Sequence, residues 1–184
     1  MATLEPRKGL DVLLAALAER PGTLPPLVVA GQAGWGGVRP EVLARDLGLA
    51  ADQVLLLGRL ADVDLAAVLH GATALVAPSR AEGFGLPVLE AMAAGVPVVS
   101  SDAAALVEVG GGATVVTPVG DAERLGAALR EVVGDAQLRS PWPSGACCGP
   151  GTSRGRRSPS ACGSSTAPWC ESAVSRPCRD RSPR

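Results

Sequence analysis

Cysteine, histidine and long apolar runs are scarce over most of this 184-residue sequence. The five cysteines all lie between positions 147 and 178, and an adjacent pair followed by isolated cysteines fits no zinc-binding pattern. A disulfide framework would need a secreted chain, but the opening MATLEPRKGL is charged where an apolar signal core would lie. No apolar run approaches the roughly 20 residues that span a bilayer, so we expect no transmembrane segment.

The two ends of the chain differ in charge and composition. Residues 1–139 carry 10 basic and 16 acidic side chains, whereas residues 140–184 carry 7 basic and 2 acidic ones and no Leu, Ile, Met or Phe. The second segment lacks the apolar side chains needed for a core. We therefore predict a folded domain at 1–139 and a disordered tail rich in Ser, Pro, Arg and Cys at 140–184.

The tail permits a second hypothesis, because offset codons for residues 151–155 allow the sequence Asp-Phe-Thr-Trp. A tail translated out of frame would explain its unusual composition. Arginine-rich tails also bind nucleic acid without sequence preference, but this one shows no periodicity, and we expect no specific nucleic-acid partner.

Hydrophobic patterns in residues 1–139 alternate between helix and strand. Leucines at 10, 13, 14 and 17 predict an amphipathic helix. Apolar runs predict strands at 27–31, 54–58, 74–79, 96–102 and 113–118. Further helices are predicted at 39–49, at 62–72 with Asp62 as cap, and after a cap at Asp121. Strands without polar alternation, separated by helices, indicate a doubly wound parallel α/β sheet whose ligands bind beyond the strands' carboxyl ends.

The stretch 81–95, AEGFGLPVLEAMAAG, follows one of these strands and contains the only phenylalanine. Pro87 suits the first residue of a helix, and Gly95 suits its end. Glu82 would then precede the helix and Glu90 would lie about one turn inside it, so both are expected to face one crevice. Glycines before the helix leave backbone N–H groups uncovered, which favours phosphate binding.

Two carboxylates beside a phosphate site suit a ligand with hydroxyls at both ends, such as a nucleotide sugar. The alternative is an ordinary strand-to-helix loop with one solvated glutamate and one glutamate on the helix surface, and the residues alone leave it open.

Residues 82–91, EGFGLPVLEA, followed by AGVPVV at 94–99, resemble the E-x7-E signature and next strand of family 4 glycosyltransferases, retaining enzymes of the GT-B fold. Residues 2–9 are similar to the opening of that family's C-terminal, donor-binding domain. The resemblance covers roughly residues 2–138 and implies a Rossmann-like domain, the second half of a GT-B fold.

The resemblance also implies roles for individual residues. Glu82 would contact the transferred sugar as the catalytic residue, and Glu90 would contact the ribose hydroxyls. Lys8 would neutralise the diphosphate; Thr3 replaces the frequent arginine partner, so Arg7 is the candidate substitute. Backbone groups would hold the sugar and phosphates at Gly83, Phe84, Gly85 and Leu86, and the base at Gly58, Arg59 and Leu60.

The expected parent reaction is retaining transfer of a hexose from a nucleoside diphosphate sugar to a hydroxyl acceptor, without a cofactor or an obligatory metal. An N-terminal acceptor domain is missing, so the isolated chain is expected to be inactive. The expected location is cytoplasmic, or membrane-peripheral in a full-length parent. Two alternatives stay open: a nucleotide-binding module that needs a separate acceptor domain, and a non-functional pseudogene product. An oxidoreductase is disfavoured because the G-x-G-x-x-G fingerprint is lacking.

Three further predictions concern single residues and the first strand. His70 is predicted to end a helix, and Arg80 to be a solvated loop residue. The opening strand is reduced to residues 2–4, although the first strand is central in doubly wound sheets. We therefore predict unpaired neighbouring strands and reduced stability.

Overall fold

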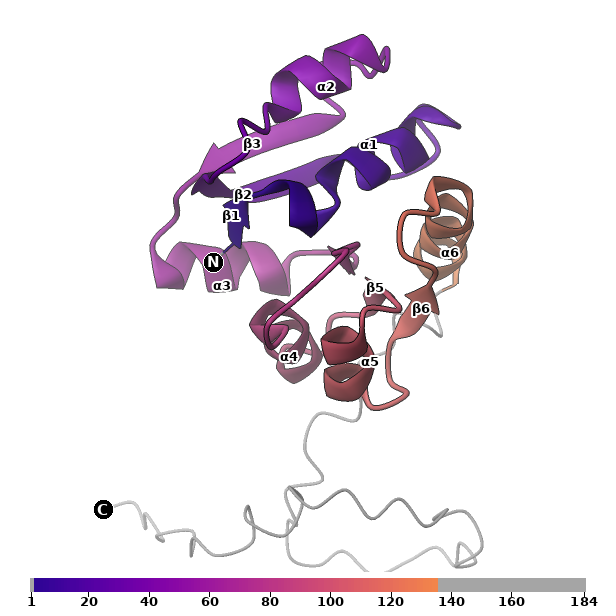
Figure 1. Cartoon of the computed structure of the whole chain (residues 1–184). Coiled ribbons are helices and arrows are strands. Elements are labelled where there is room, and N and C mark those ends of the chain that lie inside the picture. The colour runs from indigo at the N-terminus through magenta and orange to yellow at the C-terminus, as the bar shows by residue number, and fades with distance from the viewer. Residues whose placement is uncertain (1, 136–184) are drawn as a thin grey trace, which may run out of the picture. The chain divides into compact units, whose positions relative to one another are not determined.

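The computed structural model describes residues 2–135, in which strands and helices alternate (Figure 1). The tail predicted at 140–184, and the hypothesis that it is out of frame, lie outside these residues. The prediction of a domain at 1–139 therefore remains a prediction at its C-terminal boundary.

The first three strands form one parallel sheet. β1 (Ala2–Leu4), β2 (Leu27–Ala33) and β3 (Val54–Gly58) lie in the order β1-β2-β3. α1 (Leu10–Ala18) and α2 (Pro40–Asp46) pack on one face of this sheet, against apolar side chains of β2 and β3. Between β1 and α1, a short 3₁₀ helix, η1 (Pro6–Lys8), turns the chain.

The last three strands form a second parallel sheet. β4 (Leu75–Ala77), β5 (Val98–Ser101) and β6 (Val115–Thr117) lie in the order β4-β5-β6. α4 (Leu86–Ala93) and α5 (Ala104–Gly110) cover one face, and α6 (Ala122–Gly134) covers the other. α3 (Asp62–His70) joins the two sheets along the chain, and none of its residues is buried.

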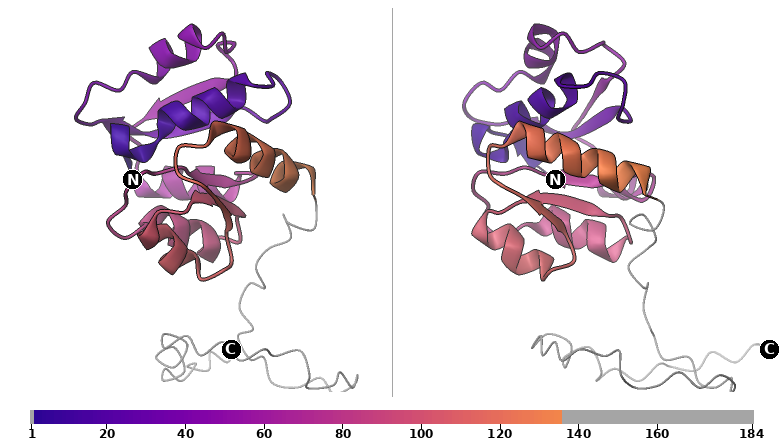
Figure 2. Two further views of the ribbon diagram at one scale, coloured as in Figure 1. Left: turned by 45° about the vertical axis from the view of Figure 1, so that its right-hand side comes forward. Right: turned by 90° about the vertical axis from the view of Figure 1, so that its right-hand side faces the viewer.

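Two apolar clusters hold these layers together. α1 and α6 pack side by side (Figure 2) and share a cluster that includes Leu14, Leu125 and Val99 of β5. α4 and α5 form the other cluster, which includes Val98 of β5. Neighbouring residues of β5 thus enter opposite clusters, as the period of two in a strand requires, and the strand is buried on both faces.

The predicted α/β class with parallel strands is confirmed, but the strands lie in two sheets rather than one. β1 pairs with β2 only from Ala2↔Gly31 to Leu4↔Ala33. Among the described residues, β4 pairs only with β5. With three residues, β1 is too short to bridge β2 and β4 into one sheet.

The ends of α3 and α6 agree only in part with the sequence. Asp121 caps α6 by accepting a hydrogen bond from the backbone N–H of Arg124, as predicted. Asp62 was the wrong cap for α3: the N-cap is Ala61, and no side chain caps this helix. His70 is the last residue of α3, as predicted.

The boundaries of α4 and the presence of α5 refine the expected pattern. α4 begins at Leu86, one residue before the predicted Pro87, and ends at Ala93; its C-cap is Ala94, which is followed by Gly95 with a φ of 71°. The sequence did not predict α5, because its residues, AALVEVG, include few leucines and lead directly into a glycine run.

Candidate functional site

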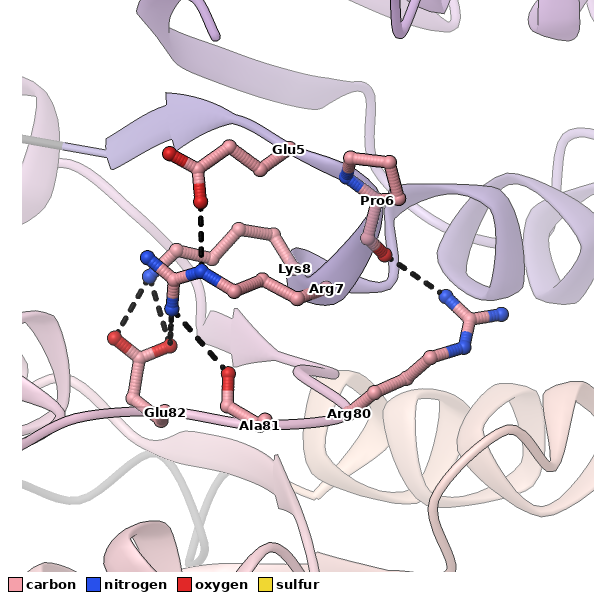
Figure 3. A network of polar contacts seen from close by, with 7 residues as sticks. All are labelled: Glu5, Pro6, Arg7, Lys8, Arg80, Ala81 and Glu82. Atoms are coloured by element: carbon pink, nitrogen blue, oxygen red, sulfur yellow. Dashed lines mark hydrogen bonds and ion pairs between the residues drawn. The ribbon is translucent and has the colours of Figure 1, made fainter. Parts of the chain in front are cut away.

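The candidate site lies where η1, after β1, meets the loop between β4 and α4 (Figure 3). The Nζ atom of Lys8 is 2.7 Å from each carboxylate oxygen of Glu82. The Glu82 side chain is only 11% exposed. Two residues that the sequence assigned to one ligand site, 74 positions apart, are therefore in direct contact.

Arg7 adds a second cation to this contact. Its Nη1 atom is 3.7 Å from Glu82 Oε2 and donates a hydrogen bond to the carbonyl oxygen of Ala81 at 3.4 Å. Its Nε atom donates to a Glu5 carboxylate oxygen at 2.6 Å. Arg7 and Lys8 thus approach Glu82 together, and we call Arg7, Lys8 and Glu82 the charged cluster.

Arg80 fixes the two segments that carry the charged cluster. Its backbone N–H donates to the carbonyl of Arg7 at 2.7 Å, and its Nη1 atom donates to the carbonyl of Pro6 at 3.0 Å (Figure 3). Its guanidinium also donates to both carboxylate oxygens of Asp11, at 2.8 and 2.7 Å. Arg80 lies in a loop and its side chain is 41% exposed, as predicted, but the prediction missed its hydrogen bonds to a carboxylate and a carbonyl that are distant in sequence.

The contact with Arg80 also affects ionisation. The hydrogen bond from the Arg80 guanidinium lowers the pKa of the Asp11 carboxyl below its ordinary value, and burial opposes this only in part. The same hydrogen bond raises the pKa of Arg80. The pair is therefore charged at neutral pH.

Gly9, next to the charged cluster, lies against the end of β4. Its φ is 69°, and a Cβ atom at this position would lie 2.1 Å from the carbonyl oxygen of Pro78. That distance is far shorter than any real contact, so only glycine allows this approach.

The start of α4 presents backbone groups beside the cluster. Gly85, the N-cap, has a φ of 82°, and a Cβ atom there would lie 3.0 Å from a methyl group of Leu106. Phe84 and Leu86 are 59% and 58% exposed, and Gly83 is exposed too. A helix leaves its first N–H groups without intrahelical partners, so this segment can donate hydrogen bonds to an anion.

A cavity of about 590 Å³ opens beside these groups. Its lining includes Lys8, Glu82, Gly85 and Glu90, and most of its other lining residues are apolar. The prediction that both glutamates face one crevice is therefore confirmed.

The segment predicted to bind the base does not line the same cavity. Gly58 ends β3, and Arg59 and Leu60 follow it. None of the three lines the cavity that contains Lys8, Glu82 and Glu90. Their predicted role remains a prediction.

Residues 2–135 contain no group of three or more His, Cys, Asp or Glu side chains placed to hold a metal ion. No helix in that range is long and apolar enough to cross a membrane.

Comparison with known proteins gives a consistent result. The family model described as "Glycosyl transferases group 1" matches residues 1–146. The serotype-specific mannosyltransferase WbdA of Escherichia coli is 39% identical over 104 residues, which is 52% of this chain and 12% of that protein. The D-inositol 3-phosphate glycosyltransferase of Rhodococcus erythropolis is 44% identical over 100 residues, 50% of this chain and 22% of that protein.

Solved structures extend the similarity to the fold. Anabaena Alr3699/HepE in complex with UDP-glucose matches with a TM-score of 0.67 and 26% identity, over 78% of this chain and 40% of that one. The chain thus spans less than half the length of each of these three proteins.

Proposed function

Because the chain belongs to the group 1 glycosyl transferase family, we propose that it binds the nucleoside diphosphate hexose of a retaining hexosyl transfer to a hydroxyl acceptor. The observation that carries this proposal is the contact of Lys8 with Glu82 at a cavity that Glu90 also lines. The solved structures of Alr3699/HepE with UDP and with UDP-glucose support a nucleotide sugar as the ligand class.

In this proposal, the diphosphate binds Lys8, Arg7 and the N–H groups at the start of α4. In the structure, Glu82 pairs with Lys8 at 2.7 Å and lies 3.7 Å from Arg7, whose Nε atom is paired with Glu5 at 2.6 Å. A diphosphate carries more charge than one carboxylate, so it would draw Lys8 and Arg7 toward itself. Glu82 would then be released to accept hydrogen bonds from sugar hydroxyls.

The remaining donor contacts follow the family resemblance. Glu90 would accept hydrogen bonds from ribose hydroxyls, and the backbone from Gly83 to Leu86 would hold sugar and phosphates. Backbone groups at Gly58, Arg59 and Leu60 would contact the base. This last contact requires the end of β3 to border the bound ligand, which makes it the most demanding part of the proposal.

Catalysis would be electrostatic. N–H groups and Lys8 would stabilise the leaving diphosphate, and Glu82 would orient the sugar, without an obligatory metal ion. A separate N-terminal domain would supply the acceptor contacts, so the chain alone would bind donor without transferring it. A cytoplasmic location, or peripheral membrane association of a longer parent, belongs to the same proposal.

Calorimetry on the full chain tests donor binding. UDP-glucose and GDP-mannose are titrated into the chain and into its Glu90→Gln variant, with NAD as the control ligand. We expect one nucleotide sugar to bind and Glu90→Gln to weaken it by about tenfold, because a charged hydrogen-bond acceptor is lost. Glu108→Gln, on the neighbouring helix α5 and outside the cavity lining, is the matched control and should bind like the unaltered chain.

Each outcome separates the alternatives. Equal affinity in the Glu90→Gln variant would contradict the assigned site. Donor binding without transfer, even with an acceptor domain added, would favour a nucleotide-binding module. A chain that neither binds nor shows dispersed amide signals would favour a non-functional product.

A further inference from the structure

Glu5 lies next to the charged cluster, and its side chain is nearly buried. Only 11% of that side chain is exposed, and one of its carboxylate oxygens accepts a hydrogen bond from the Arg7 Nε atom at 2.6 Å (Figure 3). Water screens ion pairs between exposed side chains, but it screens a nearly buried carboxylate much less. The contact can therefore fix the orientation of the Arg7 guanidinium.

The loop after β2 lies directly against Glu5. The N–H of Gly34 in this loop donates to the carbonyl of Leu4 at 3.2 Å. A Cβ atom at position 34 would lie 2.8 Å from the Cγ atom of Glu5 and 2.9 Å from the carbonyl oxygen of Leu4. Because Gly34 has no side chain, the loop can close against Glu5 and limit the movement of its carboxylate.

Arg7 keeps part of its guanidinium available to a ligand. This planar group has five N–H donors. Glu5 accepts from Nε, while Nη1 donates to the carbonyl of Ala81 and lies 3.7 Å from Glu82. Within residues 2–135, the Nη2 atom of Arg7 makes no hydrogen bond or ion pair. While Glu5 holds Nε, the two N–H groups of Nη2 can therefore donate to an anion.

We propose that Glu5 is a positioning residue, which holds Arg7 so that the charged cluster binds two phosphate groups rather than one. Lys8 donates to one phosphate group, and Arg7, held through Nε, donates to the other. Glu5 acts on the ligand through Arg7 and does not touch it. This inference rests on the proposed function, because it assumes that a diphosphate binds at the charged cluster.

Two effects of Glu5 on an anion oppose each other. Its negative charge repels the anion, whereas its hydrogen bond to Arg7 favours the second phosphate contact. Repulsion between charges falls gradually with distance and is weakened by the solvent that reaches Arg7, but a hydrogen bond is lost once the donor rotates away. We therefore expect positioning to dominate, so that removal of the Glu5 charge weakens diphosphate binding.

NMR titration of the full chain with inorganic diphosphate and inorganic phosphate tests the proposal without a nucleotide. Glu5→Gln should weaken diphosphate binding by about five- to tenfold and phosphate binding by less than about twofold. In the Arg7→Met background, Glu5→Gln should cause no further loss, because the residue through which Glu5 acts is already removed. Glu108→Gln on α5 is the matched control and should leave both affinities unchanged.

The amide spectrum of each variant shows whether it folds. If Glu5→Gln does not fold, Glu5→Asp replaces it: this change keeps the charge but withdraws the carboxylate from Arg7, and it should cause the same selective loss. Unchanged or tighter diphosphate binding in these variants would overturn the proposal. An equal loss for phosphate and diphosphate, or the same loss in the Arg7→Met background, would do so too, because Glu5 would then act on the fold and not through Arg7.

Calorimetry with UDP-glucose and GDP-mannose separates this inference from the proposed function. A nucleotide sugar that binds equally well to the unaltered chain and to Glu5→Gln would overturn the role of Glu5 and leave the proposed function intact. Selective diphosphate binding without binding of either nucleotide sugar would support the role of Glu5 and count against the proposed function. An unaltered chain that does not bind diphosphate would overturn the inference.

Discussion

The two three-stranded sheets are both built on apolar runs, but β5 of one sheet and β3 of the other differ greatly in burial. All four residues of β5 are buried, with apolar clusters on both faces. In β3, with the sequence VLLLG, only Val54 is partly buried, and Leu55, Leu56 and Leu57 are 41–43% exposed. An apolar run therefore indicates a parallel strand correctly, but whether that strand is buried depends on its neighbours.

The difference arises from what covers each sheet. The β4-β5-β6 sheet has α4 and α5 on one face and α6 on the other. The β1-β2-β3 sheet has α1 and α2 on one face, whereas α3, the next helix along the chain, has no buried residue. The half of the domain next to the short strand β1 is thus the less completely packed one.

Removing a leucine from each half should show this difference most clearly. Leu125→Ala deletes a side chain that is 1% exposed in α6 and should lower the free energy of unfolding by about 2–5 kcal/mol. Leu56→Ala, in β3, should cost less than about 1 kcal/mol, because that side chain is 43% exposed. Urea unfolding of both variants measures the two costs, and equal costs would contradict the contrast between the sheets.

The second prediction concerns the charged cluster that joins the two halves. Lys8→Met keeps the apolar stem of the side chain but removes the charge, so affinity for the bound nucleotide sugar should fall by about tenfold or more. Calorimetry measures this change, with Arg45→Met on the exposed surface of α2 as control.

If the Lys8→Met variant failed to fold, it would also lose affinity for the nucleotide sugar, although Lys8 need not contact the ligand. The double variant Lys8→Met/Glu82→Gln also removes the carboxylate that loses its nearest cation in the single variant, so it should fold at least as well as Lys8→Met and still bind weakly. Full affinity in either variant would remove Lys8 from the donor site.

The smallest expected effect is the pH dependence of the Asp11–Arg80 pair. Because folding lowers the pKa of Asp11, its contribution to stability is complete above the unfolded value of about 3.9 and is lost as the pH falls below it. The two side chains are 49% and 41% exposed, so solvent screening limits the contribution to about 0.5–1 kcal/mol.

Asp11→Asn should therefore be less stable than the unaltered chain at pH 6 by this amount, and the two should converge near pH 2. Urea unfolding at both values tests this, with the exposed Asp46→Asn as control. A constant difference at both values would mean that the ionised Asp11–Arg80 contact is not the cause.

Most of the fold was predictable because apolar periodicity reports local structure directly. The five strands predicted from apolar runs are all present, as is the cap at Asp121. The division into two sheets was not predicted, because it depends on how far β1 reaches beside β2. The helix α5 was missed because alanine and valine, which dominate it, give no clear helical stripe.

The candidate site was predictable in part for a similar reason. Glu82 and Glu90 are placed by the start of a single helix, so their spacing in sequence predicts that they line one cavity. The partner of Arg80 could not be predicted, since Asp11 lies on α1, 69 positions away from the loop that carries Arg80, and no local pattern links the two. Ion pairs of that kind become visible only when the backbone is known.

Gly9 imposes a limit on how this domain can vary in sequence. Since Pro78 leaves no room for a Cβ atom, a side chain at position 9 would act as a spacer between η1 and the end of β4. It would also move the neighbouring Lys8 away from Glu82. In a library of all residue types at this position, selection for tight packing and selection for the charged cluster should therefore retain the same single choice, glycine.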